Sequence, residues 1–247
     1  MEENNSTFLL NWLDEWTFRK RENIYEYHQF HKYPATFIPE LVDKIINLYS
    51  KKGDTVLDIF SGSGTSLLEA MLLERKSIGI ELNPLACLIS KVKTTPIEGV
   101  DFKKEKQSLI DSIKNNKYNI VNFEKIDFWF QEEAIIELSN ILGSINSIKH
   151  ESFKKLALVS LSDIIRYVSF CKHSGFKMHK DQKKLEKKFK KNEIFDLFID
   201  KLNNNINYII HINNKIKNIN ATIPLIINYD SRKISDSIKK ESIDLII

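Results

Sequence analysis

The chain of 247 residues lacks several features that would assign it to a protein class at once. It has no apolar run near the roughly 18 residues that a membrane-spanning helix needs, which excludes a membrane protein. Its only cysteines, Cys87 and Cys171, rule out a disulfide scaffold and suit a reducing, cytoplasmic compartment. No basic region followed by an apolar stretch stands at its start, so no secretory signal is visible.

Metal ligands and a strong net charge are also missing. His28 and His31 stand three residues apart but have no third ligand nearby, so we expect surface histidines and no bound metal. The formal net charge is only +4, which is compatible with a nucleic-acid partner and does not establish one.

The hydrophobic content, 42% of the residues, is sufficient for one ordinary domain, or for one domain with an additional lobe. Residues 1–33 mix aromatic and charged side chains and are predicted to form an N-terminal arm. Residues 34–97 and 221–247 carry strand-like and helix-like patterns of a cofactor-binding domain, and residues 98–220 are predicted to form a mostly helical, lysine-rich insertion. Within the insertion, residues 192–220 are typical of one long helix.

The clearest order lies between residues 34 and 97. Apolar residues at three- and four-residue spacing predict a helix that starts near Pro39 and ends before Gly53. A strand over residues 55–60, a loop over 61–66, a helix and a second strand over 77–81 follow. This order predicts an α/β fold with a Rossmann-like, doubly wound parallel sheet. Residues 222–227 and 242–247 are predicted to add two more strands, which would leave the sheet incomplete at the C-terminus.

The loop contains Gly62 and Gly64 and is flanked by two acidic residues. Asp58 ends the first strand, and Glu81 ends the next one, at a spacing that suits a carboxylate binding both hydroxyls of a ribose. An acid at that place excludes a 2′-phosphate. Leu67 stands where a pyrophosphate-binding loop has a third small residue, and Asp58 would repel phosphates, so S-adenosylmethionine is favoured over NAD. The alternative is a glycine loop that binds no ligand.

These segments, residues 58–66 and 79–84, resemble the DNA amino-methyltransferases, which produce N4-methylcytosine or N6-methyladenine. The resemblance implies S-adenosylmethionine as cofactor and DNA as partner, in a site-specific methyltransferase of the restriction-modification type. It also implies that residues 31–41 close over the methionine end of the cofactor and that Glu81 binds its ribose. Asp230 is implied to accept a hydrogen bond from the amino group of the cofactor's adenine. The implied cofactor-binding residues are Phe37, Asp58, Phe60, Gly62, Gly64, Thr65, Glu81, Asn83 and Asp230.

The catalytic loop of that family is a tetrapeptide with two consecutive prolines and an aromatic residue. The five prolines of this chain are isolated, and the strand that would lead into the loop is residues 242–247. No catalytic residue is therefore assigned. We expect the chain alone to be inactive, as a truncated product, a cut piece or part of a split enzyme whose second polypeptide supplies the loop.

The segment from residue 177 to residue 191 contains eight lysines. It could be a solvated surface or a surface that contacts DNA phosphates. The candidates for DNA contact are Lys177, Lys183, Lys184, Lys187 and Lys188. Two alternatives to a DNA methyltransferase stay open: an RNA methyltransferase, and a non-catalytic subunit that binds DNA and cofactor. The target base and the recognition sequence cannot be assigned from these residues.

Overall fold

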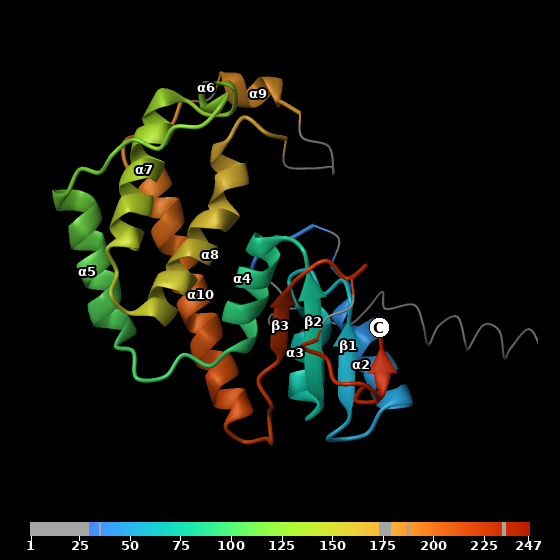
Figure 1. Cartoon of the computed structure of the whole chain (residues 1–247). Coiled ribbons are helices and arrows are strands. Elements are labelled where there is room, and N and C mark those ends of the chain that lie inside the picture. Colours follow the sequence, from blue (N-terminus) through green and yellow to red (C-terminus); the bar gives the residue numbers. More distant parts are fainter. Residues whose placement is uncertain (1–29, 35, 173–178, 187, 234–235) are drawn as a thin grey trace, which may run out of the picture. The chain divides into compact units, whose positions relative to one another are not determined.

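The computed structural model describes residues 30–34, 36–172, 179–186, 188–233 and 236–247 (Figure 1). The chain divides into two compact units. Among the described residues, one unit, here called the sheet unit, comprises residues 36–95 and 215–247, and the other, the helical unit, comprises residues 30–34 and 96–214.

The sheet unit contains four parallel strands in the order β3-β2-β1-β4 (Figure 1). The strands are β1 (Thr55–Asp58), β2 (Lys76–Glu81), β3 (Leu225–Asn228) and β4 (Leu245–Ile246). Three helices accompany them: α2 (Pro39–Tyr49), α3 (Thr65–Leu72) and α4 (Pro84–Thr94). Strand, loop, helix and strand thus follow one another as predicted, and the α/β, Rossmann-like fold is confirmed.

The three helices bury the same face of the sheet. Val56 on β1 packs in one apolar cluster with Val42 and Ile46 of α2 and Ala70 of α3. Ile226 on β3 packs with residues of α3 and α4. Side chains alternate along a strand, and the register places Asp58, Gly79 and Ile226 side by side, so Ile226 and Val56 point to the same side. The packing of the helices on this face holds the first residues of α3 and α4 near the carboxyl ends of β1 and β2.

The last two strands are shorter than the patterns predict. Residues 222–227 suggest a strand, but β3 begins at Leu225, because Pro224 has no N–H to donate to a neighbouring strand. The final strand pairs with β1 only over Leu245 and Ile246, although Ile247 still donates to the carbonyl oxygen of Leu57 at 2.9 Å.

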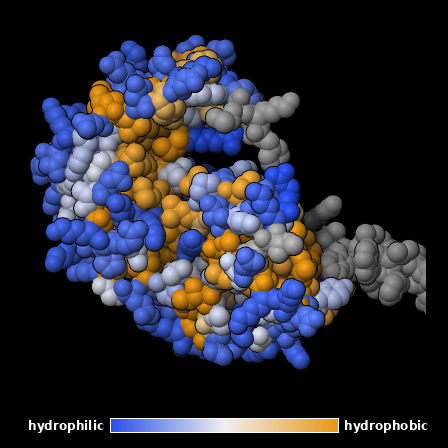
Figure 2. Space-filling model, in the orientation of Figure 1, coloured by the Kyte–Doolittle hydropathy of each residue, from blue (hydrophilic) through white to orange (hydrophobic). Residues whose placement is uncertain are grey.

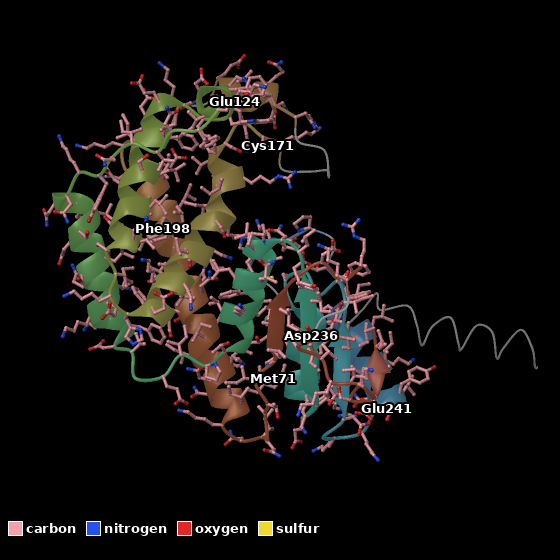
Figure 3. All side chains as sticks on the ribbon, viewed as in Figure 1. Met71, Glu124, Cys171, Phe198, Asp236 and Glu241 are labelled. Atoms are coloured by element: carbon pink, nitrogen blue, oxygen red, sulfur yellow. The ribbon has the colours of Figure 1, made fainter. Side chains whose placement is uncertain are left out.

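The helical unit contains six described helices around an apolar interior. They are α5 (Phe102–Asn115), α6 (Ile126–Trp129), α7 (Glu132–Asn146), α8 (Glu151–Val168), α9 (Gln182–Leu185) and α10 (Glu193–Ile216), the last extending two residues into the sheet unit. Phe198, labelled in Figure 3, lies on α10 and is fully buried, as is Phe153 on α8. Hydrophobic side chains also reach the surface of this unit (Figure 2), among them Ile120, Phe123 and Ile136. The predicted long helix at 192–220 is confirmed as α10.

The segment just before the sheet unit is fixed within the helical unit. Phe30 is 2% exposed and packs on Tyr208, and the side chain of His31 is hydrogen-bonded to the Ser162 hydroxyl at 3.0 Å. The backbone N–H of Lys32 donates to Asp163 at 2.7 Å. These contacts place residues 30–33, predicted as the end of the arm, in the helical unit. His31 is thus a buried hydrogen-bonding group, which corrects its prediction as a surface histidine. Residues 1–29, with the other arm residues and His28, lie outside the described residues.

Candidate functional site

A cavity of about 470 Å³ opens at the carboxyl end of β1, within the sheet unit. The segment before α2, the end of β1, the glycine loop and the start of α3 form its wall. In open parallel sheets, ligands bind at this edge, where loops leave the strands. The lining residues are Thr36, Phe37, Asp58, Phe60, Ser61, Gly62, Ser63, Thr65, Ser66 and Ile247.

The glycine loop adopts a conformation that its two glycines permit. Gly62 and Gly64 have φ angles of +50° and +78°, in the left-handed region that side chains with a Cβ rarely adopt. A Cβ on Gly64 would also lie 2.1 Å from the hydroxyl oxygen of Ser90 on α4. Glycine at position 64 therefore allows both the turn into α3 and the close approach of α4.

Asp58 is the buried acid of the cavity. It is 2% exposed, and its carboxylate accepts hydrogen bonds from the hydroxyl of Ser66 and, at 3.0 Å, from the backbone N–H of Phe60. Burial raises the pKa of this carboxyl above its usual value, and the two hydrogen bonds act in the opposite direction. Phe60 itself is 72% exposed, so an apolar ring stands beside a buried carboxylate at the mouth of the cavity.

Glu81 holds the loop from the end of β2. One carboxylate oxygen accepts from the backbone N–H of Gly62 at 2.9 Å, and the other accepts from that of Asn83 at 2.7 Å. The side chain of Asn83 in turn caps α4, because its oxygen accepts from the N–H of Leu85 at 3.0 Å. Glu81 is thus adjacent to the cavity and positioned by two main-chain donors.

Asp230 follows the end of β3 and is paired with Arg232. Three hydrogen bonds of 2.7–3.3 Å join the guanidinium to the carboxylate. These bonds lower the pKa of Asp230 to about 2, so the side chain is ionised at neutral pH. An exocyclic amino group could donate a hydrogen bond to Asp230 only beside the guanidinium of Arg232 or in its place.

Five of the nine predicted cofactor residues line one cavity: Phe37, Asp58, Phe60, Gly62 and Thr65. Gly64, Glu81, Asn83 and Asp230 do not line it, although Gly64 and Glu81 shape the loop that does. Sequence reasoning did not assign Ser66, whose position one residue into α3 was a signal for a group near Asp58. It also missed Asn228, whose amide donates to the carbonyl oxygens of Glu81 and Leu82 at 2.8 and 2.9 Å.

The lysines predicted to contact DNA have different environments. Lys183 and Lys188 are exposed, whereas Lys177 and Lys187 lie outside the described residues. The ammonium of Lys184 lies within hydrogen-bonding distance, 2.8–3.1 Å, of four backbone carbonyl oxygens, those of Arg166, Tyr167, Ser169 and Cys171. Lys184 therefore closes the carboxyl end of α8, where orphan carbonyl groups and the helix dipole favour a cation.

Replacement of Lys184 by methionine should lower the free energy of unfolding of the helical unit by about 1–3 kcal/mol, because carbonyl groups at the end of α8 lose a charged donor. Amide hydrogen exchange over α8 measures the change. Lys183→Met, which removes the neighbouring exposed lysine, should change it by less than about 0.5 kcal/mol. If the amides of α8 exchanged equally slowly in both variants, the role of Lys184 as a cap of α8 would be wrong.

The described part of the chain offers no group of three or more histidine, cysteine or acidic side chains placed to hold a metal ion. None of the helices found there is long and apolar enough to cross a membrane.

Comparison with known proteins shows that most of the cavity wall lies in a segment similar to a known family. Residues 3–92 match the N6/N4 DNA methylase family, described as DNA methylase. The type II methyltransferase M.MvaI of Kocuria varians is 37% identical over 140 residues, which cover 51% of this chain and 31% of that protein. The type II methyltransferase M.MjaII of Methanocaldococcus jannaschii is 33% identical over 121 residues, which cover 49% of this chain and 22% of that protein. The chain thus spans less than a third of the length of either relative. No solved structure matches the chain.

The matched residues include the wall of the cavity from Thr36 to Ser66, together with Glu81. The resemblance seen in the glycine loop and its acids is therefore confirmed. Residues 3–92 of the chain are therefore similar to the N6/N4 DNA methylase family, the DNA amino-methyltransferases.

Proposed function

We propose that the sheet unit binds S-adenosylmethionine in the cavity at the end of β1. The observation that carries this proposal is the lining: a left-handed glycine loop, a buried carboxylate and two exposed aromatic rings on one cavity. The cofactor has an apolar purine, ribose hydroxyls and two cationic groups. Aromatic rings suit the purine, and carboxylates suit the hydroxyls and the cations.

The roles of the residues follow from their positions. Phe37 and Phe60 offer apolar surface, and Asp58 supplies negative charge inside the cavity. Glu81 fixes the loop through Gly62 and keeps lone pairs for ribose hydroxyls, because each of its oxygens accepts from one main-chain N–H and can accept more. When bound, the cofactor supplies an electrophilic methyl group on a sulfonium.

We further propose that the whole protein transfers this methyl group to an exocyclic amino group of cytosine or adenine in DNA. The family match and the names of M.MvaI and M.MjaII, both type II methyltransferases, support that reaction. The proposal includes both cytosine and adenine, because the cavity that we describe would hold the methyl donor and not the target base. Enzymes that modify a base inside a duplex extrude it from the stack, so a separate surface must bind the DNA.

The ribose role of Glu81 can be tested by titration calorimetry with S-adenosylmethionine. Glu81→Ala should weaken binding by about 1.5–3 kcal/mol, because the ribose no longer donates hydrogen bonds to a charged group. Glu241→Gln, at an exposed acid of the same unit (Figure 3), is the matched control and should bind as the wild type does. If the folded wild type binds no S-adenosylmethionine, the proposed function is wrong; if both variants bind equally, only the ribose assignment is wrong.

The exposed lysines Lys183 and Lys188 remain the candidates for DNA phosphates. The double variant Lys183→Gln/Lys188→Gln should bind DNA more weakly and with a shallower dependence on salt, by about 0.9 in the logarithmic slope for each phosphate that is no longer neutralised. Fluorescence anisotropy with a labelled duplex at several salt concentrations measures this slope. An unchanged slope would identify the segment as a solvated surface only.

A further inference from the structure

The last turns of α4 press against the glycine loop through two buried side chains. Ser90 is fully buried, and its hydroxyl occupies the space beside Gly64. One turn later, Lys93 is 3% exposed, and its ammonium donates to the carbonyl oxygen of Ser63 at 3.2 Å. The helix therefore contacts two consecutive residues of the loop that lines the cavity.

The contact at Ser63 fixes a complete peptide plane. The N–H of Gly64, at the other end of the same peptide group, donates to the carbonyl oxygen of Ser61 at 2.8 Å. Because a trans peptide is planar, holding its oxygen and its N–H determines the orientation of the whole unit. Glu81 holds the N–H of Gly62 in the same loop. Lys93 is thus the side chain that anchors the Ser63–Gly64 peptide from α4.

A lysine in this place has a cost that an apolar residue would not have. Buried ammonium groups lose their hydration, and a long apolar side chain could fill the same volume. Among the described residues, Glu69 on α3, itself 5% exposed, is a charged group that acts on Lys93. Burial lowers the pKa of Lys93 to about 7, and the carboxylate of Glu69 opposes this shift. An ammonium donor thus occupies a buried place that an apolar side chain of similar length could fill.

We propose that Lys93 is a positioning residue of the cofactor site, which holds the Ser63–Gly64 peptide in the orientation that S-adenosylmethionine requires. This inference rests on the proposed function. It assigns Lys93 no contact with the cofactor or with the target base. Its effect should appear in cofactor affinity, through the loop, rather than in the packing of the sheet unit.

Titration calorimetry with S-adenosylmethionine at pH 6 tests the proposal. Lys93→Met keeps the length of the side chain but removes the donor, and it should weaken binding by about tenfold, the equivalent of one hydrogen bond to a charged group. Lys93→Gln retains an N–H donor and should lie between Lys93→Met and the wild type. Lys91→Met, at an exposed lysine of the same helix, is the control and should bind within about twofold of the wild type.

The pH dependence separates positioning from packing. Between pH 6 and pH 8.5 the ammonium of the wild type loses its proton, so the ratio of the Lys93→Met and wild-type dissociation constants should fall. Titration of the cofactor itself is common to both proteins and cancels in this ratio. A merely structural role predicts a constant ratio and no advantage of Gln over Met.

The outcomes are distinct. A folded wild type that binds no S-adenosylmethionine overturns the proposed function. A wild type that binds, with Lys93→Met binding equally well, overturns the positioning role alone. If the Lys93 variants do not fold, lysine side-chain NMR of the wild type decides: by linkage, saturation with the cofactor should move the titration midpoint of Lys93 upward by about half a pH unit or more. An unmoved midpoint overturns the inference.

Discussion

Replacement of Gly64 by alanine is expected to lower the free energy of unfolding of the sheet unit by about 2–5 kcal/mol. A left-handed conformation costs a residue with a Cβ about 1–2 kcal/mol. The new Cβ would also lie 2.1 Å from the hydroxyl of the fully buried Ser90, so α4 or the loop must move, and overpacking of this kind costs about 1–3 kcal/mol. Chemical denaturation of the variant and the wild type measures the difference.

Gly53 provides a matched control for this prediction. Its φ angle of +88° is also left-handed, but a Cβ there would have no atom within 4 Å. Gly53→Ala should therefore cost only the conformational part, about 1–2 kcal/mol. The difference between the two variants isolates the contact between Gly64 and Ser90. The double variant Gly64→Ala/Ser90→Gly should recover the overpacking part, and a failure to recover it would show that this contact is not the cause.

The local order of the sheet unit was predictable because its signals are local. A short apolar run, a Gly-x-Gly loop and a helical pattern follow one another within residues 55–72, and each pattern is complete within a few residues. The start of α4 was also predictable, because Asn83 caps the helix and Pro84 fits its first position. The ends of β3 and β4 were less certain, since pairing with another strand decides where a strand begins.

The candidate site was predictable only in part, for the same reason. Phe37 and the loop residues lie on segments whose type was clear, and the parallel sheet brings them to one edge. The contact of Lys93 with Ser63 joins residues 30 positions apart, and no periodicity or spacing reports it. Similarly, Lys184 belongs to a lysine-rich run in the sequence, but folding directs it to the end of α8. Composition indicates that a lysine is present, and only tertiary structure shows which oxygen atoms it meets.

His31 illustrates how burial changes a residue that looks like a surface group in the sequence. Its ring is hydrogen-bonded to Ser162, and its other nitrogen lies 3.7 Å from the carboxylate of Asp163, which is also paired with Lys201 at 2.9 Å. Burial lowers the pKa of His31 to about 4; Asp163 opposes this shift, and Lys201 adds to it. The imidazole is therefore neutral in the folded protein at pH 7.

This lowered pKa should make the helical unit sensitive to acid. The unfolded chain takes up a proton at His31 near pH 6.5, whereas the folded chain does so only near pH 4. Between these values the unfolded state binds more protons, so the free energy of unfolding falls as the pH falls. The stabilising contribution is fully present above about pH 6.5. About 3 kcal/mol of it should be lost between pH 7 and pH 4, because a pKa difference of one between the two states corresponds to about 1.36 kcal/mol.

His31→Gln separates this contribution from the titration of other groups. Glutamine remains neutral, so the loss of stability between pH 7 and pH 4 should be about 3 kcal/mol smaller in the variant than in the wild type. Amide hydrogen exchange over α8 and α10 measures it within the helical unit. His211→Gln, at an exposed histidine on α10, should lose as much stability as the wild type. If His31→Gln and the wild type lose stability in parallel, the acid sensitivity arises elsewhere and His31 titrates normally in the fold.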